Sequence, residues 1–154
     1  MADASTIVVS SSQIAYVSSG ASIAAAGFSA SSDIANALTS TNMKRWPRCD
    51  AVLTISQASS TSNTAMSVPL FRRDINIDGT ADEGIPNSSS QQHYVGSFTL
   101  SSSASTTVQS MNLNDIPLPA TTDCEFYLSN ALTNLISAGW TLKITPKTDV
   151  GATV

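Results

Sequence analysis

The stretch AGWTLKITPKT, residues 138–148, decides the fold. Apolar and polar side chains alternate through it one by one: Trp140, Leu142 and Ile144 against Thr141, Lys143 and Thr145. Because successive side chains of a β-strand point to opposite faces, this alternation predicts a strand with one face in the core and the other in water. The most regular pattern in the chain is therefore a strand pattern, and it favours a β protein.

Shorter runs of the same kind precede this strand. Going back along the chain they are CEFYLSN (124–130), TTVQSMNLNDIPL (106–118), HYVGSFTLSSS (93–103), TAMSVPLFRRDINID (64–78) and WPRCDAVLTISQAS (46–59). In two of them we expect Met66 to share a face with Val68 and Leu70, and Tyr94 to share one with Phe98. About seven or eight short strands separated by polar turns predict an all-β fold, a jelly-roll-like antiparallel β-sandwich.

The first 44 residues have a less regular pattern. Two β-branched runs, Thr6–Val9 and Ile14–Val17, predict one interrupted strand or a pair of edge strands. The Ala-rich segment 19–42 has no clear period, and it offers one helical turn with Ser32 or Asp33 as its N-cap. We therefore expect an N-terminal arm or extension over residues 1–44 and a β-sandwich body over residues 45–154.

The composition is rich in hydroxyl groups and poor in charge. The chain has 27 Ser and 17 Thr, but only 12% of its residues are charged, and its net charge is −4. An acidic chain is a poor partner for nucleic acid, which needs a basic face. We see neither a secretory signal nor an apolar run long enough to span a membrane. We therefore expect a protein made in the cytoplasm that binds neither nucleic acid nor membrane.

Most of the cations fall into two groups. Five of the seven are Lys44, Arg45, Arg48, Arg72 and Arg73. These groups are either solvated strand ends or a contact patch for an acidic partner surface. They are the candidate contact residues of this sequence.

The two cysteines, Cys49 and Cys124, lie too far apart in the sequence for a zinc or redox motif. Both are flanked by strand-like sequence, so a disulfide is geometrically possible. We expect free, buried thiols instead, because no secretory signal directs the chain to an oxidising compartment.

The sequence offers no convergent catalytic group. His93 is the single histidine, and no G-x-S-x-G elbow, P-loop or dinucleotide motif occurs. The acidic residues cluster in one loop or stand alone, unlike the paired carboxylates of glycosidases. We therefore expect a protein that is not an enzyme and needs no cofactor, with His93 as an ordinary strand-end residue.

One segment resembles half of a calcium-binding loop. DINIDG, residues 74–79, has oxygen ligands at positions 1, 3 and 5 and glycine at position 6. Position 12 is Ile85 rather than the bidentate glutamate, and no flanking helix pattern is present. We interpret the segment as a strand that ends in a turn at Gly79, with Ile75 and Ile77 pointing inward. Calcium binding by Asp74, Asn76 and Asp78 stays open at this point.

Several linked segments together carry a resemblance to a known family. They are PLFRRDINIDGTADEGIP (69–86), HYVGSFTL (93–100), LNDIPLP (113–119), CEFYLSN (124–130) and AGWTLKITPKT (138–148). In this order, over roughly residues 45–148, they resemble the cement or decoration proteins of podovirus-like tailed phages. The resemblance implies a jelly-roll-like protein on the outer surface of the virion, bound to the major capsid protein and to copies of itself as dimers or trimers. It implies no catalytic residue.

The expected function is therefore structural: decoration of an icosahedral head, stabilised by bridging its capsomers. We expect residues 1–40 to contact the capsid or a neighbouring copy. The alternative is a carbohydrate-binding or adhesin-type module, whose sugar platform would be an exposed tryptophan. Trp46 is the candidate for that role, whereas Trp140 begins the alternating strand and is expected in the core.

Overall fold

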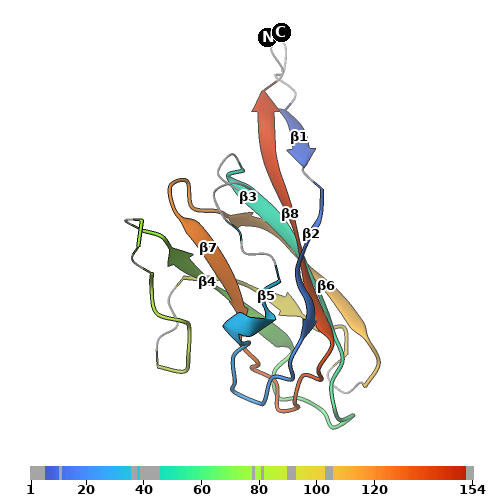
Figure 1. Cartoon of the computed structure of the whole chain (residues 1–154). Coiled ribbons are helices and arrows are strands. Elements are labelled where there is room, and N and C mark those ends of the chain that lie inside the picture. The colour runs from blue at the N-terminus through green and yellow to red at the C-terminus, as the bar shows by residue number, and fades with distance from the viewer. Residues whose placement is uncertain are drawn as a thin grey trace.

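Two antiparallel β-sheets pack against each other as a β-sandwich (Figure 1). The structure is a computed structural model, and it describes residues 6–10, 12–35, 38, 46–77, 79–80, 82–89, 93–102 and 106–151. The prediction of an all-β antiparallel sandwich is confirmed. No helix in these ranges has the length and apolarity that crossing a membrane requires.

The larger sheet has five strands, and the smaller sheet has three. The larger comprises β1 (Thr6–Ser10), β2 (Ile14–Gly20), β3 (Arg48–Ile55), β6 (Gln109–Pro117) and β8 (Trp140–Gly151). The smaller comprises β4 (Ser67–Ile75), β5 (Tyr94–Thr99) and β7 (Asp123–Leu128), in the order β5-β4-β7. Strand β8 contains the stretch 140–148, and it joins β3 on one edge to both β1 and β2 on the other.

The antiparallel pairs are nested along the chain. Strand β2 pairs with β8, β3 with β6 and β4 with β5, so that each pair encloses the next. Between β2 and β3, Phe28 and Leu38 form isolated bridges with Ser129 and Cys124, at the end and the start of β7. The segment between β2 and β3 therefore borders β7.

The core lies between the two sheets and follows the predicted alternation. Trp140, Leu142 and Ile144 are at most 2% exposed. The Trp140 ring lies against Gly20 of β2, and its Nε1 donates to the Ala21 carbonyl at 2.7 Å. A Cβ at position 20 would lie 2.0 Å from Cε2 of this ring, so the close contact between β2 and β8 requires glycine.

Within residues 1–44, strand β2 lies in the body, where it pairs with the first part of β8. The two β-branched runs form β1 and β2 and pair with β8, because β8 is longer than β3 and offers an edge to both. Tyr16 is fully buried, and its hydroxyl accepts from the Phe126 amide at 2.7 Å. A short 3-10 helix, η1 (Ser31–Asp33), lies slightly before the predicted helical turn, and its N-cap is Ala30 rather than Ser32 or Asp33.

What extends from the body is a two-stranded ribbon of β1 and the last part of β8. Figure 1 shows this ribbon beyond the end of β3, with both ends of the chain at its tip. The register pairs Thr6 with Gly151 and Ser10 with Lys147.

Three of the expected inward side chains point elsewhere. Met66 precedes β4 and is 39% exposed, and Ile77 follows β4 and is 49% exposed, since neither belongs to a strand. Tyr94 is 59% exposed because the β4–β5 register shifts between Leu70 and Phe71. A bulge of this kind turns the side chain to the other face, where the Tyr94 ring meets Phe71 at 5.7 Å.

Candidate functional site

Charge is distributed unevenly over the molecule. Most described charged side chains lie at one end of the sandwich, here called the charged end: Arg48, Asp50, Arg72, Arg73, Asp74, Asp82, Glu83, His93, Asp115, Glu125 and Lys147. The described residues of the loops 21–30, 56–66, 100–108 and 129–139 form the opposite end, here called the uncharged loop end. These four ranges contain no Asp, Glu, Lys, Arg or His.

At the charged end, ion pairs tie together three strands of the larger sheet. Lys147 of β8 contacts Asp50 of β3 at 2.6 Å and Asp115 of β6 at 2.8 Å. Arg48 of β3 contacts the same Asp115 oxygen at 2.5 Å. The hydrogen bonds that Lys147 donates to Asp115 and Asp50 raise the pKa of Lys147, and the bond that Asp115 accepts from Lys147 lowers the pKa of Asp115. The charged forms of Lys147 and Asp115 therefore stabilise each other.

Arg72 links the smaller sheet to the larger one. Its Nε donates to Asp74 Oδ1 at 2.8 Å, and its Nη1 donates to the Pro117 carbonyl of β6 at 3.3 Å. In the β4–β7 register, Arg72 lies opposite Phe126 and Asp74 lies opposite Cys124. Phe126 and Cys124 are core residues, so Arg72 and Asp74 cover the core at the charged end.

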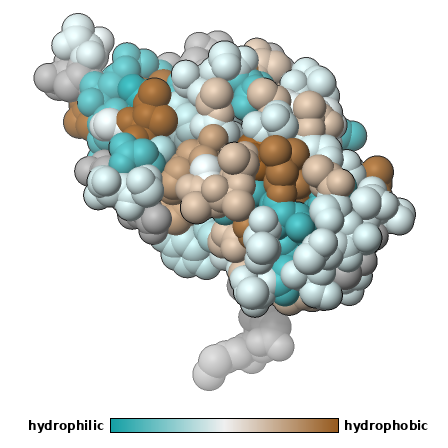
Figure 2. Space-filling view, turned by 90° about the horizontal axis from the view of Figure 1, so that it is seen from below, coloured by the Kyte–Doolittle hydropathy of each residue, from teal (hydrophilic) through white to brown (hydrophobic). Residues whose placement is uncertain are grey.

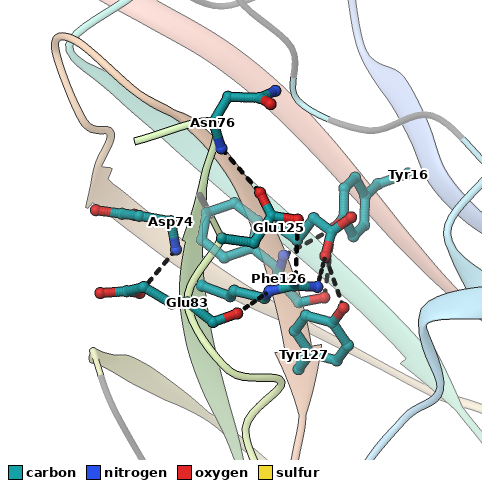
Figure 3. Close-up of polar contacts among 9 residues, drawn as sticks. Tyr16, Asp74, Asn76, Glu83, Glu125, Phe126 and Tyr127 are labelled. Carbon is teal, nitrogen blue, oxygen red and sulfur yellow. Dashed lines mark hydrogen bonds and ion pairs between the residues drawn. The ribbon is translucent and has the colours of Figure 1, made fainter. Parts of the chain in front are cut away.

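Arg73 lies on the outer face of the smaller sheet and holds three groups. Its Nη1 contacts Glu125 of β7 at 3.0 Å, its Nη2 contacts Asp82 at 3.2 Å, and its Nε donates to the Glu83 carbonyl at 2.6 Å. Figure 3 shows Glu125 beside Tyr127, whose hydroxyl donates to Glu125 Oε2 at 2.6 Å. Burial and this hydrogen bond raise the pKa of Tyr127 to about 12.

The predicted contact cations are therefore placed as follows. Lys44 and Arg45 lie outside the described residues. Arg48, Arg72 and Arg73 are partly buried and each has a carboxylate partner. Two arginines of the smaller sheet face the carboxylates of Asp74, Asp82, Glu83 and Glu125, so this region is acidic rather than basic. That arrangement weighs against contacts carried by free positive charge.

His93, Glu83 and Asp74 have ligand atoms within 4.8 Å of one another. However, His93 Nε2 contacts Glu83 Oε1 at 2.9 Å, the other Glu83 oxygen accepts from the Asp74 amide at 2.9 Å, and Arg72 holds the Asp74 carboxylate. Burial alone would raise the pKa of Glu83, but the bond from the Asp74 amide and the neighbouring His93 lower it overall. The three groups bind one another, and we assign no metal site to them.

Two of the three predicted ligands of the calcium-like segment, Asp74 and Asn76, bind other side chains. Asp78 lies outside the described residues, and the Asp74 carboxylate is occupied by Arg72. The Asn76 side chain donates to Asp123 Oδ2 at 3.0 Å. The predicted turn is present, with Gly79 at φ +91 and its amide donating to the Asn76 carbonyl at 3.3 Å.

Cys49 and Cys124 are free and buried, as predicted. Burial raises the pKa of Cys124 to about 12, and burial also raises the pKa of Cys49. Because the thiolate is the reactive form, both thiols are poor nucleophiles at neutral pH.

Buried amide side chains join the loops of the uncharged loop end. Asn130 is fully buried; its Nδ2 donates to the carbonyls of Ile23 at 2.8 Å and Asn134 at 3.0 Å, and its Oδ1 accepts from the Leu132 amide at 3.0 Å. The loops 21–30 and 129–139 are further joined by a bond from the Ala26 amide to the Asn130 carbonyl at 2.8 Å.

The same kind of contact fixes the other two loops. Asn134 donates from its backbone to Asn63 Oδ1 at 2.9 Å and from its side chain to Gln57 Oε1 at 3.1 Å. Gln109, 6% exposed, accepts from the amides of Ser101 and Ser102 through Oε1, at 3.1 Å each. The uncharged loop end is thus one connected unit, although it has almost no regular structure.

Sequence reasoning did not identify these amides. The sequence does contain a signal for them, because Asn130 and Asn134 alternate with Leu132 and Ile136. Both of these apolar residues are buried in the structure. An amide among core residues must find hydrogen-bond partners, and the nearby loops supply them.

Both tryptophans are buried: Trp46 is 8% exposed and Trp140 is 2% exposed. The expectation for Trp140 is confirmed, whereas Trp46, the candidate sugar platform of the alternative function, is buried. Comparison with protein-family models, with curated proteins and with solved structures finds no match to this chain.

Proposed function

We propose that the protein is a structural capsid decoration protein that binds the outer surface of an icosahedral phage head and bridges its capsomers. The observation that carries this proposal is the set of ion pairs at the charged end. Arg48, Arg72, Arg73 and Lys147 each bind carboxylates on neighbouring strands, and Arg72 also joins the two sheets. Among the described residues these groups tie strands of both sheets together, which supports a role in which the protein resists mechanical force.

The topology supports the same proposal. A jelly roll has nested antiparallel pairs of this kind, from β2 with β8 inward to β4 with β5. Phe28 and Leu38 form bridges beside β7, where a jelly roll would have a further strand. We propose that the fold is a jelly roll. Jelly rolls are common in viral capsid and lectin domains, so this fold suits both functions predicted from the sequence.

Decoration also suits the chemistry of the chain. A protein repeated many times over a shell gains strength through avidity, even where each contact is weak. The proposed partners are the major capsid protein and further copies of this chain, as a dimer or trimer. The acidic net charge of −4 fits a protein partner better than the packaged DNA.

The test is binding to heads that lack the protein. Purified protein is mixed with such heads, the particles are sedimented, and the bound fraction is measured against an unrelated β-sandwich protein of similar size. We expect saturable binding and a rise in the temperature at which the heads release DNA. Binding no better than that of the control protein would refute the proposal.

A second candidate is a carbohydrate-binding module, and one exposed ring favours it. Tyr94 is 59% exposed and its ring meets Phe71 edge-on, so much of the side chain is accessible to a sugar. A glycan array tests this candidate, with a Tyr94→Ala variant as the control. Binding that the variant loses would support a carbohydrate-binding role.

A further inference from the structure

We propose that the uncharged loop end is the surface through which the protein docks on the shell. The inferred partner is an uncharged, partly apolar area of the shell protein. This inference rests on the proposed function, and it names the end of the molecule that makes the contact.

The first argument is the chemistry of this surface. Met66 is 39% exposed, Leu135 is 37% exposed and Val108 is 63% exposed, and Ala24–Ala26 are exposed beside them. Figure 2 looks onto this end and shows apolar surface near its middle, with pale, weakly polar surface around much of it. Apolar and hydroxyl groups without charge match a partner that is itself uncharged.

The second argument is the cost of removing water. A buried charge is expensive unless it is fully paired, whereas apolar groups gain free energy when they leave water. The four loops carry no charged residue, so covering them desolvates no charge. The charged end has the opposite property, because its arginines and lysine already bind carboxylates of the same chain and a partner would have to compete with those pairs.

The third argument is rigidity. Loops normally lose conformational entropy when they bind, and this loss reduces affinity. Here Asn130, Asn134 and Gln109 hold the loops through buried hydrogen bonds before any partner arrives. The fully buried Asn130 alone joins residues of two segments, Ile23 and Leu132. A surface ordered in advance loses little entropy on docking.

The experiment uses the full chain and measures its affinity for heads that lack it, by co-sedimentation. Leu135→Glu places a charge on the uncharged loop end, and Ile77→Glu places the same charge on a side chain that is 49% exposed near the charged end. Thermal melting of both variants checks that they fold. We expect Leu135→Glu to weaken binding by about tenfold or more and Ile77→Glu to change it by less than about twofold, since burying an unpaired charge costs more than 1.4 kcal/mol.

A salt series on the wild-type protein is the second measurement. Raising NaCl from 0.05 to 0.5 M shortens the screening length from about 14 Å to about 4 Å, so charged contacts weaken strongly. We expect the wild-type affinity to change by less than about twofold over this range. Steep salt dependence, or a folded Leu135→Glu that binds as wild type does, would overturn the inference. Failure of the wild type to bind any head would instead refute the proposed function.

Discussion

Replacement of Asn130 by alanine tests whether a side-chain amide holds the uncharged loop end together. The variant loses three hydrogen bonds: two to the carbonyls of Ile23 and Asn134, and one from the Leu132 amide. The Ile23 carbonyl keeps the bond it accepts from Ile136, but the Leu132 amide, in a residue that is 2% exposed, loses its partner. At about 1 kcal/mol for each bond, with an added 1–2 kcal/mol for the unpaired amide, the expected loss of unfolding free energy is about 4–5 kcal/mol.

Urea denaturation followed by tryptophan fluorescence measures this loss, because both tryptophans are buried and report on the core. We expect a lower midpoint with an unchanged slope, and a melting temperature about 8–16 °C lower. Asn112→Ala is the matched control, since Asn112 is exposed on β6 and its loss should be nearly neutral. A loss below about 1 kcal/mol for Asn130→Ala would show that the loops do not depend on this amide.

Three further predictions concern the core and the charged end. Gly20→Ala should lower the unfolding free energy by about 2–3 kcal/mol in the same denaturation assay, because the new methyl group overlaps the Trp140 ring; wild-type stability would contradict this contact. A thiol reagent at about pH 8 should modify neither Cys49 nor Cys124 in the folded protein and both in urea, and rapid labelling without urea would contradict their burial. The pKa of Glu83 is lower in the folded chain, so its stabilisation is complete above the unfolded pKa, about 4.3, and is lost as the pH falls toward the folded value. Glu83→Gln should therefore reduce the loss of stability between about pH 5 and pH 3, and an unchanged pH profile would contradict this role.

Local patterns in the sequence predict the strands, but they do not predict which strands meet. The alternation from Trp140 to Ile144 is local, so the strand and its buried face follow from the sequence alone. The two runs in the first 20 residues also predict strands. Their place in the sheet depends on the edge of β8, which lies more than 100 residues away along the chain. For this reason the sequence predicts two strands there, but not their pairing with β8.

The candidate site was harder to predict, for the same physical reason. Arg73 looks like a free cation in the sequence, but its partner Glu125 lies 52 residues away and becomes a neighbour only through the β4–β7 register. Tyr94 fits the alternation of its strand, yet a register shift turns it to the outer face. Neither a bulge nor an ion pair between strands far apart in the chain leaves a local trace in a single sequence.

The pairing of Thr6 with Gly151 has a practical consequence. Paired residues of neighbouring strands lie about 5 Å apart, so a short glycine-rich linker could close the chain into a circle. A circular permutant with new ends in the exposed segment 87–89 would then keep the ribbon as a closed hairpin. Peptides fused to the original ends would leave from the tip of the ribbon, at the end of the molecule away from the four uncharged loops. If those loops face the shell, the fused peptides would be displayed on the outside of the particle.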